Sequence, residues 1–459
     1  MVALRRRGWG VPSASGSLAA APSPTSESRV ERTLRIGMLG CGTVGSGVVT
    51  ILEREAADLS ARTGAHLVVT RVAVRDLAKD RGLPLPPEIF TDDPVSVVDA
   101  DDVDIVVEVM GGREEAGELI RRALSAGKPV ITANKELIAH DGPALSDLAR
   151  STGVDLAFEA AVAGAIPIIK PLKESLAGDR ITRVVGILNG TTNYILTKMS
   201  EEQAEYAAAL AEAQALGFAE ADPAADVGGH DAAAKTAIIA SLAFDTAVHA
   251  ADVYREGIEA VTPADIEVAD QLGYVVKLLG IASEIDGKVG VRVHPTFLPK
   301  DHPLAGVRES FNAIFVQADA AGELMFYGRG AGAMPTGSAV VGDLIDAARN
   351  LLRTAPGSFA PMHHDKPLRP MEDLQTQYYV RLDVEDRVGV LADTAHIFGD
   401  HDVSIAQVWQ EGANDTAQLV LITHRAFERD LRSCVDALEA SDGVRQVASV
   451  LRVESEVFE

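Results

Sequence analysis

Apolar and polar positions along the chain predict strands and helices in alternation from Leu34 onward. LRIGMLG has the pattern of a short buried strand, and VVTILEREAADL after it has helical spacing. The strand pattern returns in LVVTRVAV, which ends at Arg75, and then in DIVVEVM, KPVIT and VDLAFEA, with helical segments between the later ones. Strands that alternate with helices are typical of a parallel, doubly wound sheet, which we expect over residues 32–160.

The pattern changes after Glu159. EAAVAGAIPIIKPL reads as a crossover loop that runs into a helix, and RITRVVGILNGTTNYIL reads as a strand that runs into a helix start. Strand-like runs separated by Gly, Pro and Asp then fill residues 282–329 and predict an antiparallel layer. We expect an α+β domain for substrate binding and dimerisation at residues 161–354, with a helix at 335–355 that packs back on the first domain.

The tail has its own order of elements. Residues 355–375 are rich in Pro, His and Asp and read as a linker. Beyond them the runs follow the order βαββαβ, which predicts a ferredoxin-like unit at 376–459 as a further domain. Residues 1–31 lack periodicity, and we expect a disordered extension there.

Composition narrows the class of protein. The chain has 459 residues, 47% of them apolar, and a net charge of −25. This charge argues against nucleic acid and against an anionic membrane surface as partners. No run approaches the roughly 20 apolar residues of a spanning helix. Cys41 and Cys434 lie far apart, which fits a reducing, cytoplasmic location.

A glycine-rich turn follows the first strand. Gly40, Gly42 and Gly45 form G-x-G-x-x-G with Thr43 and Val44 between the last two, and a helix follows. Strand, turn and helix in this order predict a Rossmann-type dinucleotide site, with the phosphates at the helix N-terminus. Arg75 at the end of the second strand suits the 2′-phosphate of NADP, whereas the adjacent Asp76 leaves NAD open.

Polar residues also follow the later strands. Lys135 and Glu159 fall at strand carboxyl ends, where ligands bind in open parallel sheets. A lysine at a helix start is electrostatically unfavourable, because the helix dipole is positive there. This mismatch favours a functional role for Lys135 over an ordinary surface position.

The stretch 213–235 combines carboxylates, glycines and a final lysine. Asp231 and Lys235 are four residues apart at the start of an apolar helix, which places them on one helix face. Glu220, Asp222 and Asp226 precede them. Such a loop suits a small zwitterion, whose ammonium group the carboxylates can bind. A solvated acidic loop with a surface ion pair is the alternative.

These blocks together resemble the homoserine dehydrogenase family over nearly all of residues 33–459. The signature of that family is matched within 213–235, at Ala213, Gly217, Phe218, Ala219, Asp222, Pro223, Asp226, Val227, Gly229, Asp231 and Lys235. GCGTVG, TANKELIA, EAAVAGAIPII and NGTTNYIL resemble its other blocks, and the tail with DRVGVLA resembles an ACT domain.

The resemblance implies a reversible, NAD(P)-dependent reduction of L-aspartate 4-semialdehyde to L-homoserine, on the routes to threonine, isoleucine and methionine. It implies catalytic roles for Lys235, Lys135 and Asp231. The implied cofactor residues are Gly40, Gly42, Thr43, Val44, Gly45, Arg75, Lys135, Gly217 and Gly332. The implied substrate residues are Asn189, Gly190, Thr191, Glu220, Asp226, Asp231 and Lys235.

The resemblance also implies a sodium ion, a regulatory ligand and an oligomer. Sodium would be bound by Glu159, Val162, Gly164 and Ile166. Threonine would bind near Asp386–Val390 in the ACT domain, and the chain would form a homodimer or homotetramer. Two alternatives remain from the residues themselves: a non-catalytic sensor of nucleotide and amino acid, and a dehydrogenase for another amino-acid semialdehyde.

Overall fold

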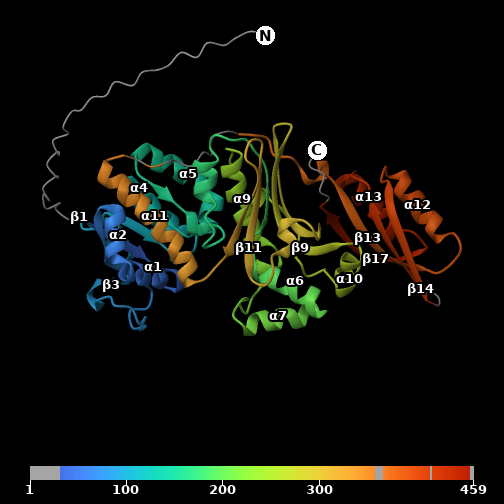
Figure 1. Ribbon diagram of the computed structural model, residues 1–459, viewed down its shortest axis with the longest axis horizontal. Helices are drawn as coiled ribbons and strands as arrows, with labels where there is room; N and C mark the ends of the chain where they lie inside the picture. Colours follow the sequence, from blue (N-terminus) through green and yellow to red (C-terminus); the bar gives the residue numbers. More distant parts are fainter. Residues whose placement is uncertain (1–31, 356, 358–364, 414–415, 455–459) are drawn as a thin grey trace, which may run out of the picture.

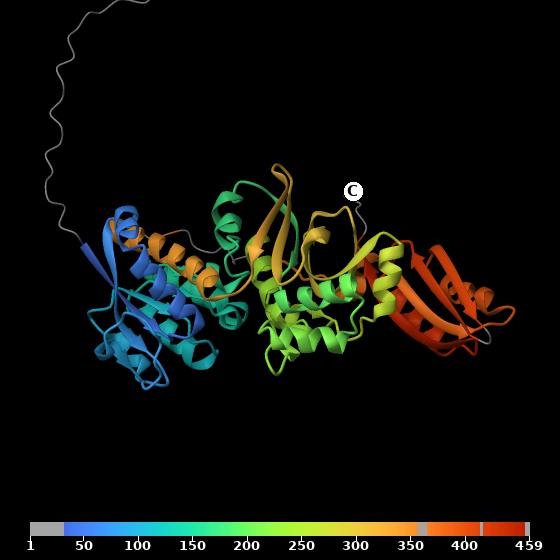
Figure 2. The ribbon, with the colours of Figure 1, turned by 60° about the horizontal axis from the view of Figure 1, so that its bottom comes forward.

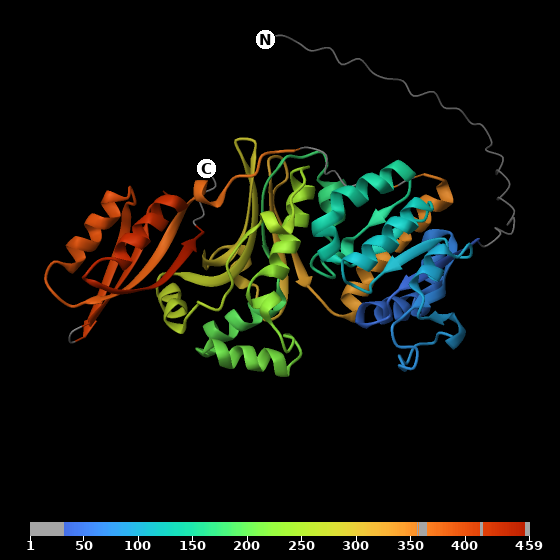
Figure 3. The same ribbon diagram turned by 180° about the vertical axis from the view of Figure 1, so that it is seen from behind.

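The computed structural model describes residues 32–355, 357, 365–413 and 416–454, which form three parts in a row (Figures 1 and 3). A domain with a parallel sheet lies at one end, a mixed domain lies in the middle, and the C-terminal unit lies at the other end. The extension expected at residues 1–31 lies outside the described residues, as do positions 356 and 358–364 of the expected linker.

The first domain contains a six-stranded parallel sheet in the order β3-β2-β1-β4-β5-β6. Its strands are β1 (Arg32–Leu39), β2 (Ala65–Ala73), β3 (Phe90–Thr91), β4 (Ile105–Glu108), β5 (Val130–Thr132) and β6 (Leu156–Ala157). The expectation that the second strand reaches Arg75 is wrong. β2 ends at Ala73, and the Asp76 carboxylate then accepts the Ala78 N–H in a turn, so Arg75 lies exposed beyond the strand.

Helices cover both faces of this sheet. One face carries α1 (Thr43–Arg54), α2 (Ala56–Thr63) and α11 (Ala333–Arg353), whose apolar stripes share one buried cluster with β1 and β4. The other face carries α3 (Pro94–Asp99), α4 (Glu114–Ser125) and α5 (Lys135–Thr152). The chain thus returns to the first domain with α11, which lies along α1 (Figure 2).

Glycines let α1 and α11 approach backbone to backbone. A Cβ atom on Gly47 would lie 2.1 Å from the carbonyl oxygen of Ala333, and one on Gly337 would lie 2.9 Å from Val48 N. Any larger residue at either position would push the helices apart. The contact brings the N-terminus of α11, at Gly332, beside the N-terminus of α1.

The middle domain contains an antiparallel layer in the order β12-β11-β7-β9-β10. The strands are β7 (Ile181–Ile187), β9 (Tyr274–Ile285), β10 (Lys288–Pro299), β11 (Phe311–Ala318) and β12 (Gly322–Arg329), and β8 (Tyr254–Arg255) pairs with β10. Its helices are α6 (Gly190–Glu202), α7 (Tyr206–Ala215), α8 (Ala224–Val227), α9 (His230–Ala243) and α10 (Pro263–Gln271). The expected layer began at residue 282 and so missed most of β9, whose continuous apolar run does not distinguish a buried strand from a buried helix.

The C-terminal unit has the expected βαββαβ order, with one short extra strand. It comprises β13 (Gln375–Glu385), α12 (Val390–Asp400), β14 (Ile405–Ala413), β15 (Thr416–Thr423), β16 (Ala426–Phe427), α13 (Glu428–Glu439) and β17 (Val444–Val453). β17 pairs with β10, so the two sheets join into one of eleven strands. The unit is therefore less separate from the middle domain than a linker alone implies.

Candidate functional site

Two lysines from different domains converge on one buried carboxylate. Lys235 and Asp231 lie on α9, and Nζ of Lys235 lies 2.7 Å from Oδ2 of Asp231. Lys135, the first residue of α5, places its Nζ 3.0 Å from Oδ1 of the same carboxylate. The i,i+4 pair predicted from the sequence thus supplies two residues of a three-residue cluster, which makes it different from a surface pair.

The charges in this cluster reinforce one another. Burial disfavours the charged form of Asp231, but Lys235 and Lys135 outweigh it and hold the pKa of that carboxyl well below its ordinary value. Asp231 in turn raises the pKa of Lys135 above its ordinary value, against the effect of burial. Asp231 therefore stays an anion and Lys135 stays a cation over the whole neutral range.

Lys235 has one donor left for a ligand. An ammonium group carries three N–H donors. Lys235 directs one to Asp231 and another to the carbonyl oxygen of Leu188, 2.8 Å away. The side chain is 12% exposed, and it lines a cavity of about 610 Å³.

The start of α6 and the acidic loop hold this cavity together. The Asn189 amide donates to Asp226 at 2.7 Å and to Asp231 at 2.9 Å. The Thr191 hydroxyl donates to the carbonyl oxygen of Phe218 at 2.6 Å. Burial raises the pKa of Asp226. A cation that enters beside Asp226 would lower that pKa again, so this carboxylate suits an ammonium group.

Most of the predicted site residues line this one cavity. They are Val44, Lys135, Gly164, Asn189, Gly190, Thr191, Gly217, Glu220, Asp226, Asp231, Lys235 and Gly332. They come from all five sequence blocks of the first and middle domains that resemble the family, and from Gly332 before α11. The cavity therefore lies between the end of the parallel sheet and the α6–α9 region.

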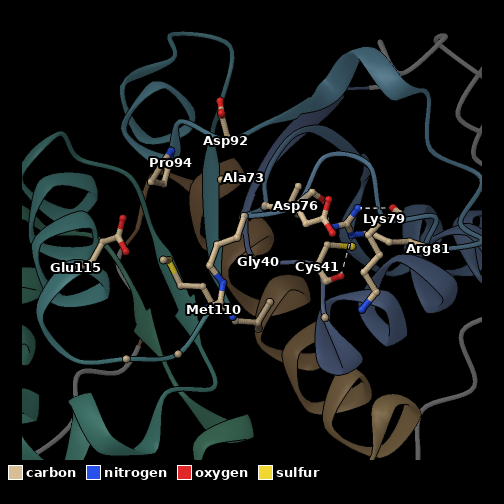
Figure 4. A pocket seen from close by; sticks show the side chains of 16 residues that line it. Gly40, Cys41, Ala73, Asp76, Lys79, Arg81, Asp92, Pro94, Met110 and Glu115 are labelled. Atoms are coloured by element: carbon tan, nitrogen blue, oxygen red, sulfur yellow. Dashed lines mark hydrogen bonds between the residues drawn. The ribbon is translucent and has the colours of Figure 1, made fainter.

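The glycine-rich turn opens on a second cavity of about 590 Å³ at Gly40 (Figure 4), and Gly42 and Arg75 also help to line it. Gly40 has a φ of +99°, and a Cβ there would lie 2.8 Å from the backbone of Met110. A Cβ on Gly42 would meet nothing within 4 Å, which leaves space for a phosphate. Thr43 begins α1, and Gly45 packs against the Gly40 carbonyl oxygen. This geometry matches the three roles of the glycines in a dinucleotide turn.

The chain is similar to known proteins along its whole described length. The family model described as homoserine dehydrogenase matches residues 167–345, its NAD-binding domain model matches 40–159, and the ACT domain model matches 378–443. A homoserine dehydrogenase of Mycobacterium tuberculosis (strain ATCC 25618 / H37Rv) is 51% identical over 435 residues, which cover 92% of this chain and 98% of the relative. The chain belongs to the homoserine dehydrogenase family.

Other relatives in the homoserine dehydrogenase family agree. The Corynebacterium glutamicum protein is 49% identical over 424 residues, 91% of this chain and 95% of its own. The solved structure from Thiobacillus denitrificans has a TM-score of 0.88 at 41% identity and covers 93% of this chain and 99% of its own. The chain is accordingly an NAD(P)-binding oxidoreductase with homoserine dehydrogenase activity and a C-terminal ACT domain.

Several residues of this homoserine dehydrogenase fold matter at the site although the sequence did not single them out. Arg81 donates to the carbonyl oxygen of Cys41 in the glycine-rich turn, and it lines the second cavity with Lys79 (Figure 4). The fully buried Glu108 accepts the N–H groups of Met110 and Gly111 and the hydroxyl of Thr132. The sequence does carry a signal for Glu108, since it is the one charged residue inside the apolar run IVVEV.

The residues implied for sodium lie in the loop that follows β6. The Glu159 carboxylate accepts the N–H groups of Ile168, Ile169 and Lys170 at 2.6–2.8 Å, so it caps a helical turn. Among the described residues, no cluster of three His, Cys, Asp or Glu side chains suits a metal ion. Backbone carbonyls of Val162, Gly164 and Ile166 in this buried loop still suit a hard cation.

One further property of the described residues bears on location. None of their helices is long and apolar enough to cross a membrane.

Proposed function

We propose that this chain reduces L-aspartate 4-semialdehyde to L-homoserine reversibly, with Lys235 as the proton donor. The observation that carries this proposal is the Lys135–Asp231–Lys235 cluster on the wall of the 610 Å³ cavity, which is the larger of the two described above. Reduced nicotinamide supplies the hydride to the aldehyde carbon when it is bound. The residues of the chain must then bind the two charged ends of the substrate and deliver a proton to its carbonyl oxygen.

Lys235 performs the proton step. Its third N–H is directed at the carbonyl oxygen, and the proton moves to that oxygen as the hydride reaches carbon. Asp231 holds Lys235 in place and remains ionised throughout. Lys135 stays a cation and stabilises the negative charge that develops on oxygen. In the reverse direction the neutral amine of Lys235 accepts the hydroxyl proton of homoserine.

The ends of the substrate are bound by opposite charges. Glu220 and Asp226 bind its ammonium group. Asn189 orients Asp226, while Gly190 and Thr191 begin α6 and present N–H groups to the carboxylate. Absorbance of reduced nicotinamide, followed with L-homoserine and either NADP or NAD, tests the reaction. The absence of turnover with both cofactors, in protein that still binds them, would support a sensor instead.

NADP is the proposed cofactor. Arg75, Lys79 and Arg81 place three cations around the second cavity, where a 2′-phosphate would lie. A homoserine dehydrogenase from a hyperthermophilic archaeon, 29% identical with a TM-score of 0.59 over 71% of this chain and 99% of its own, is described in complex with NADPH. Gly332 at the start of α11 lies beside α1 and would add a contact to the cofactor. Arg75→Ala should raise the Michaelis constant for NADP more than that for NAD; an equal rise would remove this assignment.

A sodium ion is proposed at the loop after β6. It would rest on the backbone oxygens of Val162, Gly164 and Ile166, with Glu159 shaping the loop through its three N–H bonds. This loop also presents Gly164 to the larger cavity. Thermal unfolding in NaCl and in choline chloride at equal ionic strength tests the site, and equal melting temperatures would speak against it.

Threonine is the proposed effector of the ACT domain. Gly389 directly precedes α12 and has a φ of +101°, and Val388 before it is fully exposed. An amino-acid carboxylate would bind the free N–H groups of this helix start, across a contact in a homodimer or homotetramer. Val388→Asp places a negative charge there and should weaken threonine inhibition, whereas the control Ser433→Asp on α13 should not. Full activity of the unmodified chain in millimolar threonine would end the proposal.

A further inference from the structure

Asn312 is a buried asparagine whose side chain has no partner. It lies on β11, is 1% exposed, and lines the larger cavity. Neither Oδ1 nor Nδ2 has a hydrogen-bond partner among the described residues. A buried carboxamide without partners costs free energy, and such groups are uncommon in native proteins. A ligand that forms hydrogen bonds with the carboxamide would offset this free-energy cost.

Other asparagines in the same region are fully engaged. Asn189 caps α6 through Oδ1, and its amide donates to Asp226 and Asp231. Asn193 donates to the carbonyl oxygens of Val307, Glu309 and Phe311 and accepts a hydrogen bond from Lys277. Partners are therefore plentiful nearby, and the isolation of Asn312 is specific to its position.

Two glycines bring the Asn312 carboxamide close to the backbone on the cavity wall. A Cβ on Gly330 would lie 2.3 Å from its Cγ atom, and a Cβ on Gly190 would lie 3.4 Å from its Oδ1. Gly190, Gly330 and Asn312 all line the cavity. Because neither glycine has a side chain, the carboxamide packs directly against the backbone of this wall, beside the first residue of α6.

The start of α6 lies directly beside Asn312. The first bond within this 13-residue helix runs from the Asn193 N–H to Asn189 O, and Asn189 Oδ1 takes the Thr192 N–H. The N–H groups of Gly190 and Thr191 have no partner within the helix and favour an anion. An amide NH₂ next to a helix N-terminus makes a set of donors, which suits a carboxylate better than a carboxamide.

We propose that Asn312 binds the α-carboxylate of the amino-acid substrate through Nδ2, together with the first N–H groups of α6. This inference rests on the proposed function, because it takes the substrate to be an amino-acid semialdehyde. Rotation of the carboxamide about its last bond exchanges Oδ1 and Nδ2 and presents the donor. The carboxylate is then held at Gly190. The aldehyde, with two carbons between it and the carboxylate, meets Lys235, which donates to the carbonyl oxygen of Leu188, two residues before Gly190.

Steady-state oxidation of L-homoserine with NADP tests Asn312→Ala and Asn312→Asp. Asn312→Ala should raise the Michaelis constant for homoserine roughly 10- to 100-fold, the range for one hydrogen bond to a charged group. Asn312→Asp should raise it further, since its carboxylate repels that of the substrate. The Michaelis constant for NADP should change less than about twofold, because neither variant removes a hydrogen bond to the cofactor. Gln317→Ala, on the same strand and outside the cavity lining, is the control.

L-Homoserinamide separates a carboxylate contact from a general packing effect. The unmodified enzyme should prefer homoserine to the amide, and Asn312→Asp should lose this preference. An unchanged Michaelis constant for homoserine in Asn312→Ala would overturn the proposal, and so would a rise confined to NADP. If the alanine variant unfolds, the isosteric aspartate variant decides through its homoserine-to-homoserinamide ratio. Failure of the unmodified enzyme to oxidise homoserine would overturn the proposed function itself, which is a separate result.

Discussion

At the scale of single residues, the burial and the partners of a charged side chain decide whether it can take part in a reaction or only forms a surface ion pair. Lys198 and Glu202 form an i,i+4 pair at 2.7 Å on α6, the same spacing and distance as Asp231 and Lys235. Glu202 is 57% exposed, whereas Asp231 is 9% exposed and contacts a second lysine. Water screens the first pair, so only the second has a strong effect on charge near the cavity.

Lys235→Ala should lower the turnover number roughly 10²–10⁴-fold, the usual contribution of a general acid–base group. The Michaelis constant for NADP should change little, because Lys235 contacts the carbonyl oxygen of the substrate in the proposed mechanism and does not bind the cofactor. Steady-state kinetics in both directions measure the change. Lys198→Ala, which removes the matched surface pair, is the control and should keep the turnover number. Near-normal turnover in Lys235→Ala would assign the proton step to another group.

Lys277 leads to a prediction about pH. It lies on β9, 4% exposed, and donates to Asn193 Oδ1 and to the carbonyl oxygen of Val307. Burial lowers its pKa to about 8, whereas an unfolded lysine titrates near 10.4. Between these values the unfolded chain binds more protons, so the free energy of unfolding should rise as the pH increases from about 8 to about 10.

Urea unfolding at several pH values from 7.5 to 10 measures this dependence. Lys277→Met keeps the apolar stem without the charge, and the part of the slope due to Lys277 should vanish. Lys300→Met, which removes an exposed lysine from the end of the same β10–β9 hairpin region, is the control. Equal pH slopes in the unmodified chain and in Lys277→Met would contradict the assigned pKa.

At the scale of elements, the contact between α1 and α11 connects fold to cofactor. Gly47→Ala should destabilise the fold by about 1–3 kcal/mol, the usual cost of overpacking, because its Cβ would lie 2.1 Å from Ala333 O. It should also weaken NADP binding, since it displaces the start of α11 at Gly332. Gly342→Ala on α11 is the control, because its Cβ would meet only Lys170 Nζ, at 3.9 Å.

Thermal unfolding and a fluorescence titration with NADPH measure both effects. Weaker binding should appear in Gly47→Ala and be absent in Gly342→Ala. If Gly47→Ala lost stability but bound NADPH normally, the α11 terminus would have no part in the cofactor site.

Elements with a clear period were predictable from the sequence, and those set by long-range contacts were not. The strand, glycine turn and helix at Leu34–Arg54 and the pair on α9 follow local rules of spacing. β9 could not be predicted from local spacing, because both of its faces are buried. The end of β2 was also misplaced, because a short turn at Asp76 decides it.

The same distinction holds for the site. Residue type and position along the chain singled out the lysines and the acidic loop, and the resemblance then implied their roles. Asn312 and Arg81 could not be found in this way, because their importance depends on what lies beside them. Asn312 matters through its lack of partners, and Arg81 through the carbonyl oxygen of Cys41.

At the scale of the whole molecule, the middle and C-terminal parts share one sheet and ion pairs that cross between them. β10 pairs with β17, and Arg452 from β17 contacts Glu256 of the middle domain at 2.7 Å. Arg381 from β13 contacts Asp265 on α10 at 3.0 Å. Deletion of the C-terminal unit near Leu368 would therefore leave buried carboxylates unpaired, so point variants are the better test of regulation.

The Arg381–Asp265 pair also predicts how the molecule unfolds. Arg381→Met should destabilise the chain by about 3–5 kcal/mol, as loss of one partner of a buried pair does. Asp265 is fully buried and would keep only neutral donors such as the Tyr379 hydroxyl. Asp265→Asn added to Arg381→Met should restore part of the loss. Arg429→Met removes an exposed pair with Asp373 and should have little effect.

Two probes show whether the parts unfold together. Trp409 on β14 reports the C-terminal unit by its fluorescence in a Trp9→Phe background, and dehydrogenase activity reports the middle domain. Because the sheet is continuous, both urea midpoints should fall by the same amount in Arg381→Met. A shift in Trp409 fluorescence with the activity midpoint unchanged would mean that the shared sheet does not couple the two parts. Coincident shifts would show that the middle and C-terminal parts unfold as one cooperative unit.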